Sequence, residues 1–142
     1  MTVLDAYALV AYLRKEPMAD EVADLLRQQT VLSSVNAAEV IDQLVRVFKR
    51  DIDEVHADIG LLCHAGLKLE WVSPEVGLSA GRLRARHYHR QQRAVSLADC
   101  IAAATALALH RPLATSDPAL AGLLRAEGGE VHGLPDSQGR RP

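Results

Sequence analysis

The chain has 142 residues, of which 49% are hydrophobic and 24% are charged, and its formal net charge is −2. This length and composition fit one globular domain with a core large enough to fold without stabilising disulfides, and they exclude a multi-domain organisation. The near-neutral charge disfavours general polyanion binding, although an uneven distribution of charge can still create a local nucleic-acid site. The start of the chain has no signal-peptide pattern, and its longest apolar run, Cys100–Leu109, is shorter than the ~18 residues that a membrane span needs. We therefore expect a soluble, cytoplasmic protein that makes no membrane contact.

Short apolar segments alternate with helical patterns along the whole chain. The predicted strands are residues 2–4, 30–34, 67–72, 111–115 and a short last strand within 128–134. The predicted helices are residues 6–15, 18–29, 35–50, 51–65, 74 to about 93, 97–109 and 117–127. Such alternation indicates an α/β fold in which a parallel sheet has helices on both faces. We expect the domain to span residues 1–133 and the tail, 134–142, to be disordered.

The predicted helix 97–109 is apolar on every face, and its only ionisable side chain is Asp99. A helix of this kind is normally buried, and an unpaired buried carboxylate is costly. Ser96 and Asp99 match the S-x-x-[DE] capping box that precedes an apolar run. This capping role does not exclude a second one, because a carboxylate has two oxygens and about four lone-pair sites.

Three further carboxylates stand near the ends of predicted strands. Asp5 and Asp117 each follow a strand and precede a helix, so each is also explained as an ordinary helix N-cap. Glu39 lies opposite the apolar stripe of its helix, so periodicity alone makes it a solvated surface residue. Its position in the first helical turn nevertheless places it near the carboxyl edge of the sheet.

The four acids, considered together, indicate a shared site that none of them indicates alone. In a doubly wound sheet the places that they occupy converge on one crevice at the carboxyl ends of the strands. Carboxylates at close range repel one another unless cations or protons intervene. An all-oxygen, anionic cluster suits a hard cation such as Mg²⁺ or Mn²⁺ rather than zinc.

The segments that carry these acids resemble the PIN domain ribonucleases, and within them the VapC toxins of type II toxin–antitoxin systems. The matching segments, in the family's order and spacing, are VLDAYALVAYL, SSVNAAEV, SLADCIAAATALAL and PLATSD. They are spread over nearly the whole chain. The sequence departs from many relatives at Ala6, where a Ser or Thr hydroxyl is common.

The resemblance implies a PIN-like three-layer α/β/α sandwich with a central parallel sheet of four to five strands. It also implies that Asp5, Glu39, Asp99 and Asp117 form the catalytic, metal-binding cluster of an endoribonuclease that uses Mg²⁺ or Mn²⁺ to hydrolyse RNA phosphodiester bonds. Relatives attack transfer and ribosomal RNA. The resemblance further implies a homodimer and a cognate antitoxin that blocks the cleft.

The segment RLRARHYHRQQR, residues 82–93, has five arginines and no acid. On the predicted helix, four of them fall near one face: Arg82, Arg86, Arg90 and Arg93. This face could hold RNA phosphates or an acidic segment of the antitoxin, or it could be an ordinary solvated surface. Thr115 is a further candidate for substrate binding, although a role at the strand end explains it equally well.

Other families with acids after strands fit less well. A haloacid-dehalogenase-like phosphatase needs a second Asp two residues after the first, where Tyr7 stands, and a receiver domain needs one after the third strand, where Ser73 stands. Nucleotide-binding glycine motifs are absent. The remaining alternative is a catalytically silent PIN-like module that binds RNA or a protein.

Overall fold

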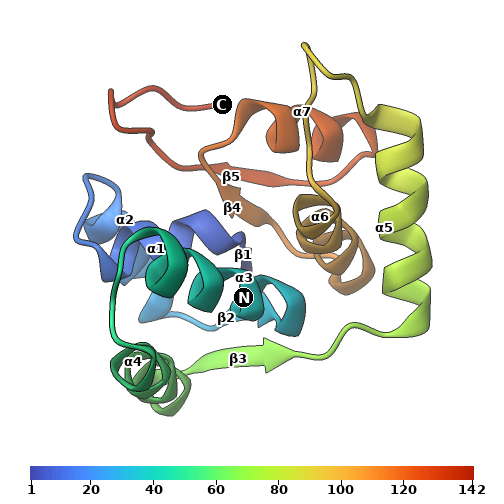
Figure 1. Cartoon of the computed structure of the whole chain (residues 1–142). Coiled ribbons are helices and arrows are strands. Elements are labelled where there is room, and N and C mark those ends of the chain that lie inside the picture. The colour runs from blue at the N-terminus through green and yellow to red at the C-terminus, as the bar shows by residue number, and fades with distance from the viewer.

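The computed structural model describes all 142 residues and has a five-stranded sheet at its centre (Figure 1). The strand order is β3-β2-β1-β4-β5, and every neighbouring pair is parallel. The strands are β1 (Thr2–Leu4), β2 (Thr30–Ser33), β3 (Leu67–Glu70), β4 (Leu113–Thr115) and β5 (Val131–Gly133). The predicted parallel sheet of four to five strands is therefore confirmed.

Helices cover both faces of the sheet (Figure 1). On one face lie α1 (Ala6–Leu13), α2 (Ala19–Leu26), α3 (Ser34–Asp42) and α4 (Ile52–Ala65). On the other lie α5 (Pro74–His87), α6 (Leu97–Leu109) and α7 (Pro118–Ala126). A π-helical turn, η1 (Gln43–Val47), extends α3, so the helix predicted over 35–50 forms with a wider last turn.

Alternation along the central strands divides the apolar residues between two cores. Leu4 and Leu32 face the first set of helices, whereas Val3 and Val31 face the second. All four are completely buried. Because both faces are covered, the strands are continuous apolar runs, as parallel sheets require.

The predicted long helix after Pro74 is shorter than expected. It ends at His87 rather than near Arg93, and Tyr88 has an extended backbone. His89 and Arg93 exchange two backbone hydrogen bonds, of 3.0 and 2.8 Å, which close a tight turn. Arg90 therefore lies on a turn that leads from α5 to α6 rather than on a helix.

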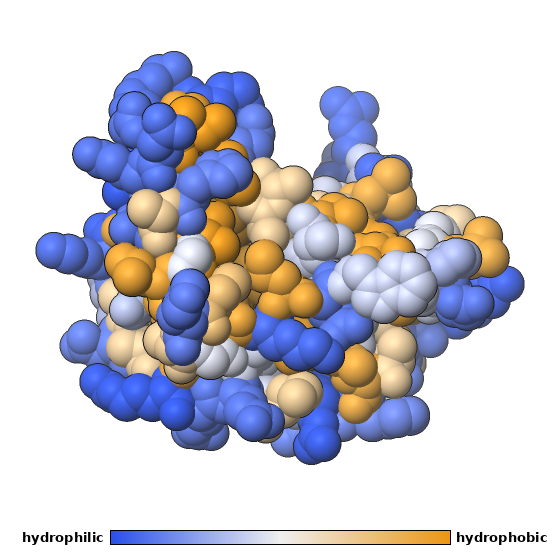
Figure 2. Space-filling view, turned by 90° about the horizontal axis from the view of Figure 1, so that it is seen from below, coloured by the Kyte–Doolittle hydropathy of each residue, from blue (hydrophilic) through white to orange (hydrophobic).

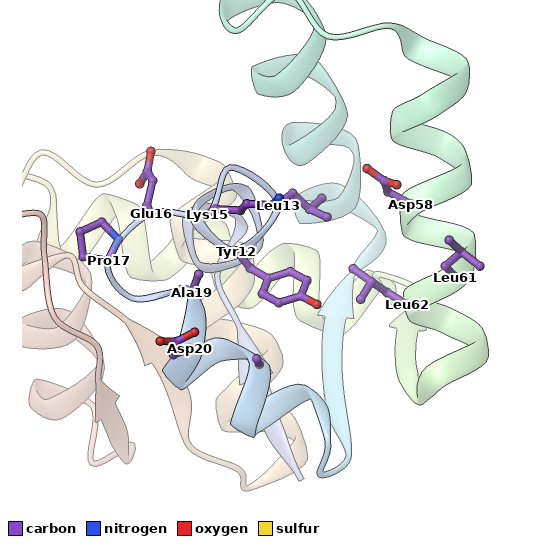
Figure 3. A pocket seen from close by; sticks show the side chains of 11 residues that line it. Tyr12, Leu13, Lys15, Glu16, Pro17, Ala19, Asp20, Asp58, Leu61 and Leu62 are labelled. Carbon is purple, nitrogen blue, oxygen red and sulfur yellow. The ribbon is translucent and has the colours of Figure 1, made fainter.

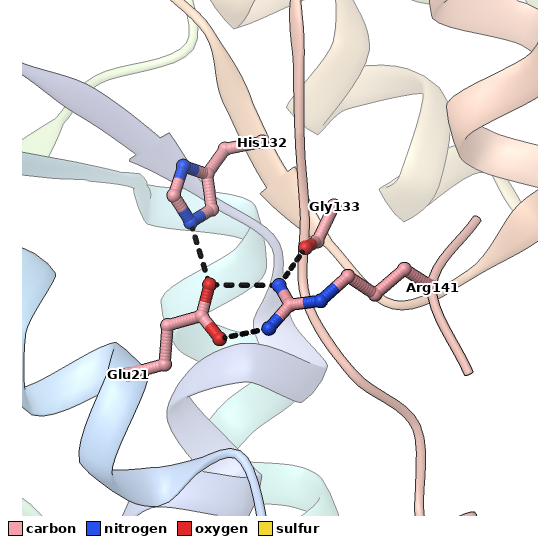
Figure 4. A network of polar contacts seen from close by, with 4 residues as sticks. All are labelled: Glu21, His132, Gly133 and Arg141. Carbon is pink, nitrogen blue, oxygen red and sulfur yellow. Dashed lines mark hydrogen bonds and ion pairs between the residues drawn. The ribbon is translucent and has the colours of Figure 1, made fainter. Parts of the chain in front are cut away.

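The C-terminal tail, which the composition predicts to be disordered, lies against α2 and β5 (Figure 4). Arg141 donates two hydrogen bonds to the Glu21 carboxylate, of 2.9 and 2.8 Å, and a third to the Gly133 carbonyl. His132 of β5 contacts the same carboxylate at 3.0 Å. The hydrogen bonds from Arg141 lower the pKa of Glu21. These contacts hold the short polar tail against the domain.

One edge of the sheet carries exposed apolar side chains. Leu69 in β3 is 43% exposed, and Trp71, just after it, is 70% exposed. Figure 2 views the molecule from below, the side on which β3 and α4 lie in Figure 1, and shows apolar surface among hydrophilic side chains. None of the helices combines the length and hydrophobicity needed to cross a bilayer.

Candidate metal centre at the carboxyl edge of the sheet

Three aspartates lie at helix starts at the carboxyl edge of the sheet, Asp5 and Asp117 as N-caps and Asp99 in the first turn of α6. One oxygen of each accepts a backbone hydrogen bond. Asp5 accepts a hydrogen bond from the backbone N–H of Ala8, and Asp117 accepts one from Ala119, both at 2.7 Å. Asp99 accepts one from the backbone N–H of Ser96, also at 2.7 Å, within the predicted capping box. The second oxygen of each carboxylate is left for another partner.

The strand register brings these aspartates together. Leu4 of β1 pairs with Ala114 of β4, so Asp5 and Asp117 leave adjacent strands at the same edge. The helix α6 packs on β1 and β2, and this contact places Asp99 above the same edge. The negative charges of Asp99 and Asp117 both raise the pKa of Asp5, which shows that the three carboxylates share one region.

Asp5 is the most buried of the acids, at 5% exposure. Burial raises its pKa to about 7, against the lowering effect of hydrogen bonds from Thr115 and Ala8. Burial also raises the pKa of Asp99, and the charge of Asp117 adds to that effect. No cationic side chain contributes at either position, so their negative charges are uncompensated by the protein.

Glu39 joins the cluster from α3, although its helical periodicity alone predicted a solvated surface position. Its side chain is half-buried, and burial together with the charge of Asp99 raises its pKa. The reason is that the amino end of α3 packs against α6, which covers this part of the helix. All four predicted acids therefore come together at one edge of the sheet.

Asn36 is a residue of this site that sequence analysis missed. It is 1% exposed, and its amide donates to the Ala98 carbonyl of α6 at 3.0 Å and to Glu39 at 3.4 Å. Ser33 in turn donates to the Asn36 side-chain oxygen at 2.5 Å. The signal was available, because Asn36 stands four residues before Val40 on the apolar stripe. An amide on such a stripe must be hydrogen-bonded.

We expect Asn36→Ala to lower the free energy of unfolding by about 1–3 kcal/mol, because it leaves the Ala98 carbonyl without its buried donor. Urea denaturation measures this loss. The exposed neighbour Ser34 provides the control, since Ser34→Ala should leave stability nearly unchanged. Equal stability of the two variants would contradict a role for Asn36 in joining α3 to α6.

Thr115 is the last residue of β4 and lies between two of the acids. Its side chain is completely buried, and its hydroxyl accepts a hydrogen bond from the Asp117 backbone N–H at 3.0 Å. The same side chain hydrogen-bonds Asp5. The contact of Thr115 with substrate stays a prediction, and in the structure its side chain hydrogen-bonds two of the acids.

The four arginines predicted to share a helical face do not do so, because α5 ends before two of them. Arg86 pairs with Glu127 after α7, at 2.8 Å. Arg93 turns back to donate to His87, whose other ring nitrogen contacts Glu127 at 2.6 Å. Arg82 and Arg90 are exposed and have no acidic partner. Two of the four thus bind the turn to the domain, and two are free to attract an anion.

Glu127 is the centre of this network, so we expect Glu127→Gln to destabilise the fold by about 1 kcal/mol at neutral pH. His87 and Arg86 lower the pKa of Glu127. Its contribution is therefore present above the pKa of the unfolded chain and is lost as the pH falls through the lower folded-state value. Thermal melting at neutral and at acidic pH measures this loss of stability. Glu130→Gln, at a nearby exposed acid, should show no such pH-dependent difference.

The donor chemistry of the cluster fits a hard divalent cation. Every side-chain donor of the four acids is a carboxylate oxygen, the type that Mg²⁺ and Mn²⁺ prefer. No three acids, histidines or cysteines are gathered closely enough to ligate one ion together. The acids still lie near enough to raise one another's pKa, and a bound cation would reduce the repulsion between their negative charges.

A wide groove lies away from these acids. It has a volume of about 730 Å³ and is formed by the end of α1, the start of α2 and the last half of α4 (Figure 3). Tyr12 extends toward Leu62 across it. The three acids that line it, Glu16, Asp20 and Asp58, are not members of the carboxylate cluster. The candidate chemistry therefore lies in the carboxylate cluster and not in this groove.

Comparison with solved structures finds the same fold. VapBC2 from Rickettsia felis, bound to a promoter DNA fragment, matches with a TM-score of 0.69 and 15% identity over 94% of this chain and 98% of the other. DNA-bound VapBC from Salmonella typhimurium matches with a TM-score of 0.68 and 17% identity, over 92% of this chain and 96% of the other. Mycobacterium tuberculosis VapC20, a toxin that cleaves the sarcin–ricin loop, gives 0.67 and 15% over the full length of both chains.

A search of curated proteins found no significant match. The family model for the PIN domain, in contrast, matches residues 2–123, a range that begins in β1 and ends in α7. It includes all four acids of the cluster. The sequence match and the sheet order agree, and the chain belongs to the PIN domain family.

Proposed function

We propose that this PIN domain is an endoribonuclease that requires Mg²⁺ or Mn²⁺ and hydrolyses RNA phosphodiester bonds. The observation that carries the proposal is the meeting of four carboxylates, from four separate elements, at one edge of the sheet without a cationic partner. Asp5, Asp99 and Asp117 would hold the cation, with Glu39 as a fourth ligand or as the ligand of a second ion. A purely structural role gives no reason to gather four acids in this way.

When bound, such a cation supplies a Lewis acid that activates water and offsets charge on the phosphoryl oxygens. The protein's own task is to fix the carboxylates before substrate arrives. Asp5 and Asp117 are held by N–H groups in the first turns of their helices, and Asp99 is held by the N–H of the N-cap residue Ser96. Glu39 is held by Asn36. Because backbone groups set these positions, little reorganisation is needed when an RNA phosphate enters.

We further propose that the chain is the toxin of a toxin–antitoxin pair, acts on ribosomal or transfer RNA, and binds a cognate antitoxin. Support comes from the structures with the same fold, which include antitoxin complexes and a toxin that cleaves the sarcin–ricin loop. The exposed Leu69 and Trp71 at the open edge of β3 favour a homodimer, because apolar sheet edges are normally covered. Sedimentation of the purified chain measures whether it is a monomer or a dimer.

The test of activity uses purified protein, ribosomal and transfer RNA, and Mg²⁺ or Mn²⁺. We expect defined RNA fragments with either metal and none after chelation, with recovery when metal is returned. A catalytically silent RNA-binding module would retain the RNA without producing fragments under any of these conditions. That outcome would overturn the proposed nuclease.

A further inference from the structure

A second hollow lies between the end of α5 and the first turn of α6, the helix that carries Asp99. Its volume is about 300 Å³, and five residues line it: Gly81, Arg84, Ala85, Tyr88 and Leu97. Gly81 and Ala85 leave its floor open because they have little or no side chain. We call it the Arg84–Tyr88 hollow.

Arg84 is held in place by contacts that include no ion pair. Its Nε–H donates to the Val95 carbonyl at 3.1 Å, and its guanidinium carbon lies 4.6 Å from the centre of the Tyr88 ring. No carboxylate pairs with it, in contrast to Arg86 two residues further on, which is paired with Glu127. The terminal nitrogens of Arg84 therefore remain available to an anionic ligand.

The other walls of the hollow are apolar and accessible. Tyr88 is 45% exposed and Leu97 is 57% exposed. Exposed aromatic and aliphatic side chains next to a free guanidinium are the groups that single-stranded RNA uses: bases stack on the ring, and phosphates bind the cation. A volume of about 300 Å³ suits one base better than a helix of a partner protein.

The position of the hollow ties it to the acids. Leu97 and Asp99 are both in the first turn of α6, so the hollow and the carboxylate cluster lie around one helix end. Burial raises the pKa of the thiol of Cys100, the residue after Asp99, and the positive charge of Arg84 acts against this rise. A cluster of uncompensated carboxylates repels RNA, and a fixed cationic group nearby would counter that repulsion.

We propose that the Arg84–Tyr88 hollow binds a nucleotide of single-stranded RNA next to the bond that is cut. Its base packs on Tyr88 and Leu97, and its phosphate contacts the terminal nitrogens of Arg84. This inference rests on the proposed ribonuclease function. It adds a subsite that selects unpaired RNA, because a stacked base in a duplex cannot enter the hollow.

The experiment measures binding of a short single-stranded RNA to the full chain in EDTA, so that no cleavage is needed. We expect Tyr88→Ala to weaken RNA binding about tenfold and Tyr88→Phe to leave it unchanged, because the ring is what stacks. Heparin, a polyanion without bases, serves as a second probe. Its binding should be unaffected by Tyr88→Ala but weakened by Arg84→Gln, whereas Arg111→Gln, at an exposed arginine just after the other end of α6, provides a charge-matched control outside the hollow. Thermal melting of each variant identifies any loss of folding.

With Mn²⁺ present, the same Tyr88→Ala change should raise KM for single-stranded RNA about tenfold and leave kcat unchanged. Equal RNA affinity of Tyr88→Ala and wild type, or equal losses for RNA and heparin, would overturn the subsite. A change in sedimentation without a change in RNA affinity would overturn it too, and would assign the surface to protein contact. If the wild type binds RNA through Tyr88 but never cleaves it, the subsite stands and the proposed nuclease fails.

Discussion

Asp99→Asn is expected to reduce metal-dependent RNA cleavage by about a hundredfold to a thousandfold, because the variant loses one charged ligand of the cation. The substitution separates metal binding by this side chain from its role in capping α6. The amide oxygen of Asn can still accept the Ser96 N–H, so the capping box and the start of α6 are kept. The measurement is the initial rate of fragment formation at saturating Mn²⁺, together with thermal melting to confirm folding.

Asp53→Asn is the matched control, because Asp53 also lies in the first turn of a helix but is exposed and remote from the cluster. It should cleave at the wild-type rate. Cleavage at the wild-type rate by a folded Asp99→Asn protein would mean that Asp99 is a helix cap and nothing more.

The second large effect concerns Asp5 and the pH dependence of stability. Its folded-state pKa of about 7 lies above the ordinary value of 3.8, so the folded protein holds this proton more tightly than the unfolded chain. The free energy of unfolding therefore falls as the pH rises between these two values, by about 4 kcal/mol once both states are ionised. Burial raises the pKa of Asp99 as well, so ionisation of Asp99 also lowers the free energy of unfolding as the pH rises.

Asp5→Asn should remove most of this loss. In EDTA we expect the variant to be more stable than wild type by a few kcal/mol at about pH 8 and equal to it at about pH 4, as measured by urea denaturation. Mn²⁺ should raise the melting temperature of wild type at the higher pH and have little effect on the variant. Parallel pH profiles for the two proteins would contradict the account of Asp5 as a buried, repelled carboxylate.

The contrast between what sequence could and could not predict has a physical basis. The positions of the strands, the helix starts and the candidate acids follow from local signals: apolar runs, capping residues and acids placed after strands. The strand order does not, and it comes from the structure. Asp5, Asp99 and Asp117 were predictable because each lies in a cap motif at a strand end or helix start. Glu39 was predictable only through family resemblance, since its own helical periodicity indicates a surface position.

The features that sequence missed depend on contacts between distant segments. The end of α5 at His87 follows from a network that includes Glu127, 40 residues away in sequence. The tail is held by Arg141 on Glu21, 120 residues apart. Periodicity extended the helix through Arg90 because it contains no information about such partners. Asn36 is different, because its place on an apolar stripe was visible in the sequence.

The central claim is that the carboxylate cluster holds a divalent cation, and anomalous diffraction from crystals grown with Mn²⁺ tests it most directly. Manganese scatters anomalously, so its position can be assigned independently of water. The account predicts an anomalous peak bounded by the carboxylates of Asp5, Asp99 and Asp117, and no peak there in crystals of Asp99→Asn. A protein that cleaves RNA in Mn²⁺ but shows its manganese elsewhere, or none at this edge of the sheet, would contradict it.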